Sequence, residues 1–362
     1  MATKKNNKSS ISHYINLAFE QAQINLGSTG SNPSVGCVVE KNGSILSSGC
    51  TSMNGRPHAE NVALNRGEYK GANIYITLEP CSHYGLSPPC TKLIIKKKIS
   101  KVFYSIDDLD KRSANKSKKI LKKKKISVNS NINLNAAKNF YKSYFLNRKK
   151  SIPLIDAKIA VSKDFLTINK SKKKFITNAV SRKRVHLLRT NYNCIISTAK
   201  TINEDNSKLN CRIQGLENKS PDIFIIDRNL NLKKNSKLLQ INNRKVFICT
   251  SVNNKIKINN IEKKNVKIIL FKELQSKNDF LKLFKKVFNL GYNRILVESG
   301  LNFLNFLLKK NFLNTLYVFQ SNKLLRKNGS NNDGIGLIKK IRLDNKIKVN
   351  LLGDKLYRCN LK

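Results

Sequence analysis

The stretch TLEPCSHYGLSPPC (residues 77–90) and the tetrapeptide PHAE (residues 57–60) bring several metal-binding side chains close together in the sequence. One imidazole and two thiols are good ligands for a borderline-soft divalent metal, and a carboxylate stands two residues from the imidazole. A catalytic zinc site needs three protein ligands, an open position for water, and a base for the protons of that water. The residues that would fill these roles are His58, Cys81, Cys90 and Glu60.

The local sequence predicts how these side chains meet. Residues i and i+2 of a regular helix do not share a face, so an imidazole and a carboxylate at that spacing cannot serve one water from mid-helix. Proline suits the start of a helix, so Pro57 and Pro80 predict His58 and Cys81 in the opening turns of two helices. The partly positive helix ends favour thiolate over thiol. The alternating run NIYIT (residues 73–77) predicts the preceding strand, and zinc deaminases carry His-x-Glu, Pro-Cys and a further Cys in this context.

Two plainer explanations of the same residues stay open. A cysteine is often only a small buried apolar side chain. A closed structural zinc site would need a fourth ligand, which His83 could provide, and Glu60 would then be an ordinary acid at a helix N-terminus. We favour the catalytic site because both halves of the pattern occur in order and in the expected local context.

The charge of the chain is strongly positive. Its 362 residues suffice for about two domains, and 70 Lys and Arg against 22 Asp and Glu give a net charge of +48. Such an excess normally indicates nucleic acid or an acidic membrane surface as the partner. Here the lysines lie in short runs along the whole chain, aromatic residues are few and tryptophan is absent, so no stacking platform for bases is evident. We therefore expect no specific nucleic-acid partner.

Cysteine usage and the N-terminal residues indicate a cytoplasmic protein. Eight cysteines without a secretory leader are typical of a reducing compartment rather than of a disulfide scaffold. The first ten residues, MATKKNNKSS, are polar and lack the apolar stretch of a signal peptide. No apolar run approaches the length needed to span a bilayer, so we also expect no membrane partner.

The first part of the chain reads as mixed α/β. Apolar residues at helical spacing predict a helix over residues 12–26. Residues 35–39 and 45–49 predict two strands, joined by Asn42-Gly43, which is the pair typical of a type I′ hairpin turn. Later segments predict a helix over residues 92–97 and a further strand, KVFYSID.

The domain boundary falls in the basic run YFLNRKKSIP (residues 144–153), whose terminal proline suits a short linker. We place the first domain at residues 1–147 and the second at residues 148–362. Strand-like runs recur between helical stretches beyond the boundary, which predicts a largely parallel sheet. The segment KIKVNLLGDKLYRC (residues 346–359) predicts a closing antiparallel pair. The strand-like runs are DIFIID, KVFICT, VKIIL and RILVES.

Residues 12–107 resemble the deaminase half of the bifunctional riboflavin-biosynthesis deaminase/reductase family. The matching segments are NPSVGCVV, PHAENVAL and TLEPCSHYGLSPPC. The eight residues between Cys81 and Cys90 separate this family from nucleoside, tRNA and polynucleotide deaminases, whose two cysteines usually have two residues between them.

This resemblance implies a cytidine-deaminase-like three-layer domain with one Zn²⁺ per chain on His58, Cys81 and Cys90, and with Glu60 as proton shuttle. The implied substrate is a pyrimidinone that carries a phosphoribosylamino group and loses the amine at C2. Family members usually have a basic residue where Leu86 stands, and a Gly-x-Gly loop within residues 108–117, where this chain has no glycine. The residues implied to bind this substrate are Asn32, His83 and Asp108.

The second half resembles the reductase domain of the same family, which implies a dihydrofolate-reductase-like α/β fold, NADPH as cofactor and a homo-oligomer. The matching segments are IDAKIAVSKD, FITNAVSRKRVHLLR, KTINEDNSKLNCR and RILVESGLNFL. The implied catalytic residues are Lys158, Asp205 and Glu298. Those implied to bind the substrate are Lys173, Arg189, Leu209 and Arg212. Those implied to bind the cofactor are Ala160, Phe175, Thr177, Thr201, Asp205, Gly300, Leu301 and Asn302.

Two of these roles have a physical case of their own. A strand ends in Glu298-Ser299-Gly300 and a helix follows, which leaves free backbone N–H groups to receive a phosphate. Arg189 and Arg212 suit a phosphate clamp because guanidinium groups make bidentate contacts. This half also departs from the family pattern at Phe165 and at Lys172-Lys173, and no Gly-x-Gly-x-x-Gly follows a strand.

Three hypotheses therefore remain. The first is a two-step biosynthetic enzyme, with the variant that only the deaminase half is active. The second is a zinc deaminase that acts on a nucleic acid, against which the Cys81–Cys90 spacing and the second domain argue. The third is a zinc-stabilised binding protein without catalysis, in which replacement of Glu60 would change nothing.

Overall fold

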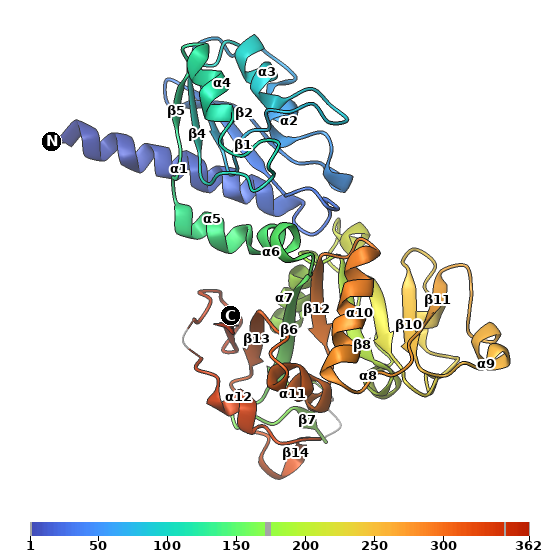
Figure 1. Cartoon of the computed structure of the whole chain (residues 1–362). Coiled ribbons are helices and arrows are strands. Elements are labelled where there is room, and N and C mark those ends of the chain that lie inside the picture. The colour runs from blue at the N-terminus through green and yellow to red at the C-terminus, as the bar shows by residue number, and fades with distance from the viewer. Residues whose placement is uncertain (1, 171–174, 344, 362) are drawn as a thin grey trace. The chain divides into compact units, whose positions relative to one another are not determined.

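The computed structural model describes residues 2–170, 175–343 and 345–361. The chain divides into two compact units between Ser151 and Ile152, and each unit has its own sheet and its own apolar core (Figure 1). The first unit contains the expected metal ligands and the second contains the residues expected to bind the reductase cofactor.

The first unit is built on a five-stranded sheet of order β2-β1-β3-β4-β5. Strand β1 pairs antiparallel with β2 and β3, whereas β3, β4 and β5 run parallel. The strands are β1 (Gly36–Lys41), β2 (Ser44–Cys50), β3 (Asn73–Ile76), β4 (Lys101–Tyr104) and β5 (Ser127–Asn129). The predicted hairpin turn is confirmed, because Asn42 and Gly43 both have positive φ, at 53° and 84°.

Helices cover both faces of this sheet. They are α1 (Ala2–Ile24), α2 (Ala59–Leu64), α3 (Cys90–Lys96), α4 (Ser117–Lys123), α5 (Leu134–Phe140) and α6 (Lys142–Lys150), with a short 3-10 turn η1 (Met53–Gly55). A Cβ atom at Gly36 would lie 1.8 Å from the carbonyl oxygen of Ala18 in α1, and one at Gly49 would lie 2.6 Å from that of Ala59 in α2. The two glycines therefore let α1 and α2 approach β1 and β2 to backbone contact.

The division between the units falls within the expected run of residues 144–153, but the short linker expected there is confined to the end of the run. Helix α6 occupies it as far as Lys150, and Ser151 ends the helix with a φ of 51°. Tyr141 and Tyr144 are buried in the core of the first unit, and this burial fixes the helix despite its exposed basic end. The basic composition of residues 144–153 comes from side chains on the exposed side of α6 and gives no indication of the buried tyrosines.

The second unit is built on an eight-stranded sheet of order β11-β10-β9-β8-β12-β6-β13-β15. Every neighbouring pair is parallel except β13 and β15, as the alternation of strands and helices predicts. The strands are β6 (Leu154–Val161), β8 (Cys194–Thr198), β9 (Asp222–Ile226), β10 (Val246–Thr250), β11 (Val266–Leu270), β12 (Arg294–Glu298), β13 (Thr315–Gln320) and β15 (Lys355–Asn360). A separate two-stranded sheet joins β7 (Ile168–Asn169) and β14 (Gly329–Ser330).

The helices of the second unit pack on both faces of the large sheet, because side chains alternate along each strand. Cys194 and Ile196 of β8 join a core cluster with α10 and α11, whereas Ile195 joins one with α8. The helices are α7 (Ala179–Arg189), α8 (Ala199–Asp205), α9 (Lys255–Asn259), α10 (Lys277–Asn289), α11 (Leu301–Lys309) and α12 (Gly336–Lys340). Three short 3-10 turns are η2 (Glu217–Lys219), η3 (Lys237–Gln240) and η4 (Arg326–Asn328).

The closing antiparallel pair has a different partner from the one expected. Strand β15 pairs with β13 rather than with the segment that precedes it. A single isolated bridge, between Lys346 and Tyr357, connects β15 to that segment. Pairing with β13 extends the large sheet by one strand, and this gives β15 more backbone hydrogen bonds than a short local hairpin would.

Candidate active sites

The expected metal ligands meet where α2 and α3 begin. His58 is the N-cap residue of α2, Cys90 is the first residue of α3, and Cys81 lies in the loop between β3 and α3. The Nδ1 atom of His58 lies 3.6 Å from the Sγ atom of Cys81 and 3.4 Å from that of Cys90. One ligand atom from each residue lies within 4.8 Å of the other two, which is the spacing of ligands around one ion.

The helix start belongs to Cys90, so the expected position of Cys81 in an opening turn is wrong. The chain stays extended and irregular after β3, and α3 begins only after Pro89, its N-cap residue. Helix α2 likewise begins at Ala59, two residues after Pro57, so His58 caps the helix instead of lying inside it. An N-cap residue has extended backbone, which turns its side chain away from the helix axis.

The donor set suits zinc. One imidazole nitrogen and two sulfurs form a typical catalytic ligand set for this metal. The backbone N–H of Cys90 donates to the Sγ atom of Cys81 over 3.3 Å. Hydrogen bonds from the side chains of Cys90 and His58 lower the pKa of Cys81 to about 4 even though burial opposes this shift. The cluster therefore stabilises a thiolate, the form that binds metal.

The cluster leaves one coordination position without a protein ligand. Among the described residues, no fourth His, Cys, Asp or Glu joins the three ligands. The Nδ1 atom of His83 instead lies 2.7 Å from the hydroxyl oxygen of Ser113. A closed structural site with His83 as the fourth ligand is therefore not what the described residues form, and a tetrahedral ion here would keep one position for water.

Glu60 lies in the first turn of α2, immediately beside the ligands. Only 4% of its surface is exposed. Burial, followed by the charge of Cys81, raises the pKa of Glu60 to about 7. A carboxyl group with that pKa can both accept and release a proton near neutrality, which is what a general acid–base catalyst requires.

The other residues expected to bind the deaminase substrate hold loops near the cluster. The side-chain amide of Asn32 donates to the carbonyl of Gly55 over 3.0 Å. The Oδ1 atom of Asp108 accepts from the hydroxyl of Tyr144 over 2.8 Å and from the backbone N–H of Asp110 over 3.1 Å. These bonds fix the loops without revealing a ligand, so both substrate roles stay predictions.

The sequence reasoning missed Arg56. Its guanidinium donates to the hydroxyl of Ser87 over 2.5 Å and so connects the segment before His58 to the loop between the two cysteines. Leu86, next to this contact, is 90% exposed. The only signal in the sequence is the position of Arg56 directly before Pro57.

In the second unit, three charged residues form a buried ion cluster. Glu298 ends β12, and Lys158 lies opposite it on β6. Arg189, the last residue of α7, donates through Nε over 2.7 Å and through Nη2 over 3.0 Å to the two oxygens of Glu298. The Nζ atom of Lys158 lies 3.5 Å from one of the same oxygens. Burial alone would raise the pKa of Glu298, but the charges of Arg189 and Lys158 outweigh it and lower that pKa to about 2.

This arrangement changes what Arg189 can do. Its remaining Nη1 atom donates to the backbone carbonyl of Asn210 over 2.7 Å, so the guanidinium fork is occupied within the protein. Arg212 is exposed and donates to the side-chain oxygen of Asn210 over 3.1 Å. Of the two arginines expected to clamp a phosphate, Arg212 is the accessible one, whereas Arg189 holds Glu298 in place.

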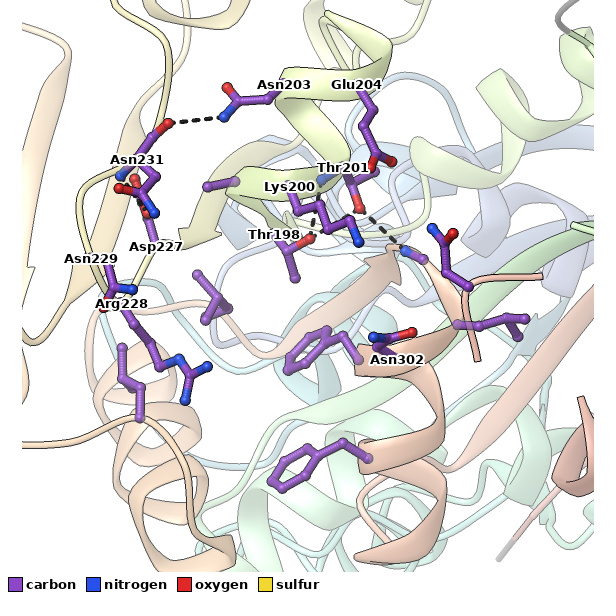
Figure 2. A pocket seen from close by; sticks show the side chains of 18 of the residues that line it. Thr198, Lys200, Thr201, Asn203, Glu204, Asp227, Arg228, Asn229, Asn231 and Asn302 are labelled. Atoms are coloured by element: carbon purple, nitrogen blue, oxygen red, sulfur yellow. Dashed lines mark hydrogen bonds between the residues drawn. The ribbon is translucent and has the colours of Figure 1, made fainter. Parts of the chain in front are cut away.

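A cavity of about 840 Å³ opens at the carboxyl ends of β8 and β9 and at the start of α11 (Figure 2). Ligands of parallel α/β sheets bind at such strand ends, and this volume suits a large organic cofactor. Gly300 caps α11, and its N–H donates to the hydroxyl of Thr201 over 3.2 Å. Four of the residues expected to bind the cofactor line the cavity, namely Thr201, Gly300, Leu301 and Asn302.

Other expected residues of this half do not line that cavity, and their roles stay predictions. Phe175 is 64% exposed and lies 4.2 Å beneath the guanidinium of Arg182, which also donates to the carbonyl of Thr177. Leu209 is buried with a φ of 45°. Lys173 falls outside the described residues. Ala160 and Asp205, also expected to bind the cofactor, are not part of the cavity wall either.

The cavity wall also contains polar side chains for which the sequence predicted no role. Lys200 and Arg228 supply positive charge, Glu204 supplies negative charge, and Asn229 and Asn231 supply amide groups. Figure 2 shows them grouped around one opening, from α8 and from the loop after β9. Lys200 and Glu204 lie within the matched segment KTINEDNSKLNCR but had no expected role. Arg228, Asn229 and Asn231 lie outside every matched segment, in a stretch whose composition resembles the rest of this Lys- and Asn-rich chain.

Two family models match the chain. Residues 8–106 match the cytidine and deoxycytidylate deaminase zinc-binding region, and residues 153–347 match the RibD C-terminal domain. These matches confirm the expected fold class, a cytidine-deaminase-like domain followed by a dihydrofolate-reductase-like α/β domain.

Similar proteins cover the chain almost from end to end. The riboflavin biosynthesis protein RibD of Aquifex aeolicus is 31% identical over 95% of this chain and 96% of its own. RibD of Buchnera aphidicola is 32% identical over 86% of this chain and 87% of its own. Among solved structures, a deaminase/reductase from Thermotoga maritima, 24% identical, has the same fold with a TM-score of 0.83 over 98% of this chain and 99% of its own. RibD of Acinetobacter baumannii, 25% identical, gives a TM-score of 0.79 over the same shares.

None of the helices in the described ranges combines the length and the apolar character that crossing a bilayer requires.

The two matched domains and the near full-length relatives confirm the expected resemblance and an enzymatic role for both halves. The chain belongs to the RibD family, the enzymes of riboflavin biosynthesis that carry a zinc-binding deaminase domain and a reductase domain.

Proposed function

We propose that the first unit, with one zinc ion, hydrolytically deaminates 2,5-diamino-6-(5-phosphoribosylamino)pyrimidin-4-one, and that the second unit reduces the ribosyl group of the product to a ribityl chain with NADPH. The observation that carries the proposal is the three-ligand cluster, with no fourth ligand among the described residues and with buried Glu60 beside it. The names of the relatives support the choice of substrate.

In this proposal, zinc would be held by His58, Cys81 and Cys90, whose Nδ1 and Sγ atoms already lie close together. Bound there, it would lower the pKa of a water ligand to about 7 and so supply hydroxide near neutrality. Glu60 accepts the proton that the water gives up as its oxygen adds to C2, and then donates a proton to the adjacent ring nitrogen. A second transfer through Glu60 lets the amine leave as ammonia, which balances the hydrolysis.

In the second unit, NADPH would supply a hydride to C1′ of the ribose-derived group. The ion cluster keeps Glu298 ionised and fixes its carboxylate through the two hydrogen bonds from Arg189. Glu298 in turn holds the ammonium group of Lys158 at 3.5 Å. We propose that Lys158 polarises the ribose oxygen and delivers its proton as the sugar opens, with Arg212 binding the phosphate and Asp205 orienting the substrate.

The test is to give the purified chain this diaminopyrimidine ribotide with NADPH and to follow ammonia release and NADPH oxidation together. A Glu60→Gln variant is expected to release ammonia about 10²- to 10⁴-fold more slowly while it retains zinc. Glu68→Gln is the matched control, because Glu68 is an exposed acid of the same unit outside the cluster.

Two results would contradict the deaminase proposal. One is a wild-type protein without stoichiometric zinc or without ammonia release, which would indicate a non-catalytic protein. The other is a Glu60→Gln variant as fast as the wild type. For the reductase proposal, the contradicting result is a wild-type chain that releases ammonia but oxidises no NADPH, because the second unit would then be inactive on that product.

A further inference from the structure

A buried arginine of the second unit binds the loop that carries Arg212, residues 206–212, here called the Arg212 loop. Arg244 lies two residues before β10, and only 6% of its surface is exposed. Its Nη2 atom donates to the backbone carbonyl of Lys208 over 2.8 Å, and its Nη1 atom donates to that of Leu209 over 3.1 Å. One guanidinium therefore holds two consecutive carbonyls of the Arg212 loop.

The sheet fixes the position of Arg244. The backbone N–H of Lys245 donates to the Oδ1 atom of Asp222 over 2.8 Å, and the N–H of Ile223 donates to the carbonyl of Lys245 over 3.0 Å. These two bonds attach the residue after Arg244 to the start of β9. The Arg212 loop is therefore bound to a side chain whose own backbone belongs to the framework of the sheet.

The Arg212 loop needs such support because its backbone conformation is unfavourable. Leu209 has a φ of 45° and Asn206 a φ of 46°. Residues other than glycine seldom adopt this left-handed region, and a leucine adopts it only where surrounding contacts hold it there. A buried carbonyl also needs a hydrogen-bond donor, and Arg244 supplies one to Leu209. Without the guanidinium, the turn at Leu209 would relax to a more ordinary conformation.

The next residue of the loop connects this support to the residues expected to bind the substrate. The backbone carbonyl of Asn210 accepts from the Nη1 atom of Arg189 over 2.7 Å. The side-chain oxygen of Asn210 accepts from the Nη1 atom of Arg212 over 3.1 Å. Two buried arginines, Arg244 and Arg189, thus hold the three consecutive carbonyls of residues 208–210, and these bonds set the direction in which Arg212 leaves the loop.

The orientation of Arg212 matters as much as its charge. A guanidinium binds a phosphate through two parallel N–H donors, so its plane has to face the phosphate oxygens. Misplacement of a binding group by about 1 Å can cost about a hundredfold in rate, even when the substituted residue is distant from the chemistry. A residue that fixes the loop can therefore control the reaction without touching the substrate.

We propose that Arg244 is a positioning residue of the reductase reaction, which holds the Arg212 loop in the conformation in which Arg212 binds the phosphate of the ribotide. This inference rests on the proposed reduction of a phosphorylated ribosyl group by the second unit. It adds a residue that acts on the substrate only through the backbone of residues 208–210.

The test supplies the full-length chain directly with NADPH and the deaminated ribotide, and compares this substrate with the riboside that lacks the phosphate. The wild type is expected to show a kcat/KM for the ribotide about tenfold or more above that for the riboside. Arg244→Met should raise KM for the ribotide about tenfold, leave kcat within about threefold, and change kcat/KM for the riboside less than about twofold. Arg244→Lys should recover part of the loss, because it keeps the charge but not the planar fork.

A double-mutant cycle tests whether Arg244 acts through Arg212. Arg244→Met should lower kcat/KM for the ribotide about tenfold in the wild-type background and less than about twofold in the Arg212→Gln background, where the phosphate ligand is already absent. Lys245→Met is the matched control, because it removes the same charge from the neighbouring residue, whose side chain is exposed. It should change kcat/KM for either substrate less than about twofold.

The results that would overturn this inference leave the reductase assignment standing. One is an Arg244→Met variant that slows the ribotide and the riboside alike, or neither, because Arg244 would then serve the fold alone. Another is an equal effect in both Arg212 backgrounds. A third is a wild type that reduces both substrates equally well, which would also end the phosphate role of Arg212. Should Arg244→Met fail to fold, the same ratio of the two substrates in Arg244→Lys decides.

A different result would contradict the proposed function itself. If the wild type oxidises no NADPH with the deaminated ribotide, the reductase assignment is wrong, and the positioning role of Arg244 is wrong with it.

Discussion

The metal cluster of the first unit and the ion cluster of the second are organised differently. The expected metal ligands lie at or near the starts of α2 and α3, and the contacts of His58 with Cys81 and Cys90 span 23 and 32 positions. The ion cluster joins side chains from β6, α7 and β12, and its central contact, Arg189 to Glu298, spans 109 positions. The first arrangement depends on local backbone geometry and the second on the assembly of the whole sheet.

This difference predicts whether a single substitution at each site would reduce activity or stability. The metal cluster leaves one coordination position without a protein ligand and holds the carboxyl group of Glu60 at a pKa of about 7. We therefore expect a substitution there to abolish ammonia release while the unit still folds. The ion cluster is closed on itself, because the carboxylate of Glu298 and the guanidinium of Arg189 satisfy one another in a buried place. A local change there leaves an unpaired buried charge and affects the whole unit.

The largest expected effect is on metal content. Cys81→Ala removes one of three ligands, so we expect zinc to fall from about one ion per chain to near zero and ammonia release to fall with it. NADPH binding should stay within twofold of the wild type, because the cavity belongs to the other unit. Metal analysis of the purified protein and a dinucleotide titration check both statements.

Cys50→Ser is the control for that experiment, because Cys50 lies in the same unit but not in the cluster. Retention of a full equivalent of zinc by Cys81→Ala would show that the metal has other ligands. Loss of NADPH binding in the same variant would show that the two sites are coupled. That result would contradict the expectation that a change in the metal cluster affects only the first unit.

The next largest effect is on the stability of the second unit. Arg189→Met removes the bidentate partner of buried Glu298, and breaking a buried ion pair from one side typically costs about 3–5 kcal/mol. Chemical denaturation should reveal this loss in a transition of the second unit. Arg112→Met should have far less effect, because it removes an exposed guanidinium from Asp110 in the first unit and leaves Arg148 3.5 Å from that carboxylate.

Equal destabilisation by both substitutions would contradict the special place of the buried cluster. A loss of reductase activity without any loss of stability would instead show that Arg189 serves the substrate directly, as the sequence first indicated.

Acid should weaken the second cluster in a defined range of pH. The pKa of Glu298 is lowered to about 2 from an ordinary value of 4.5, so its contribution to stability is complete above pH 4.5 and is lost as pH falls towards 2. The shift corresponds to about 3 kcal/mol, at about 1.36 kcal/mol for each pKa unit.

The measurement compares the free energy of unfolding of the wild type and of Glu298→Gln between pH 5 and pH 3. The difference between the two proteins should shrink as the pH falls, because the unfolded wild type takes up a proton at Glu298 in this range while the folded state stays ionised. A constant difference would mean that Glu298 is not ionised through its pairing with Arg189 and Lys158.

The smallest expected effect concerns packing in the first unit. Gly36→Ala places a methyl group against the backbone of α1, and overpacking of this kind typically costs about 1–3 kcal/mol. Gly334→Ala is the control, because a Cβ at Gly334 meets nothing within 4 Å. Thermal unfolding of the two variants checks the order, and a neutral Gly36→Ala would show that α1 can move away without cost.

The sequence allowed prediction of features that depend on near neighbours in the chain. The Asn42-Gly43 turn, strands β1 to β4 and β9 to β12, and the grouping of the three expected metal ligands belong to this kind, because each is encoded within a short segment. Helix α6 was missed because its composition is dominated by an exposed basic face, whereas buried tyrosines decide its structure.

The partner of Arg189 could not be predicted for a different reason. Its position in a family motif indicated a phosphate ligand, but only the folded sheet brings it against Glu298. Arg228 belongs to none of the motifs found in the sequence. It lines the cavity because of the order of the strands in the sheet, which the sequence pattern does not specify. Contacts between distant segments therefore set the limit of sequence reasoning here.

The division of the chain between Ser151 and Ile152 has a consequence for how such an enzyme can be inherited. Each unit has a separate apolar core, the expected metal ligands all belong to the first unit, and the residues that line the large cavity all belong to the second. A gene break at this junction is therefore expected to yield two proteins, each with its own apolar core and one of the two candidate sites.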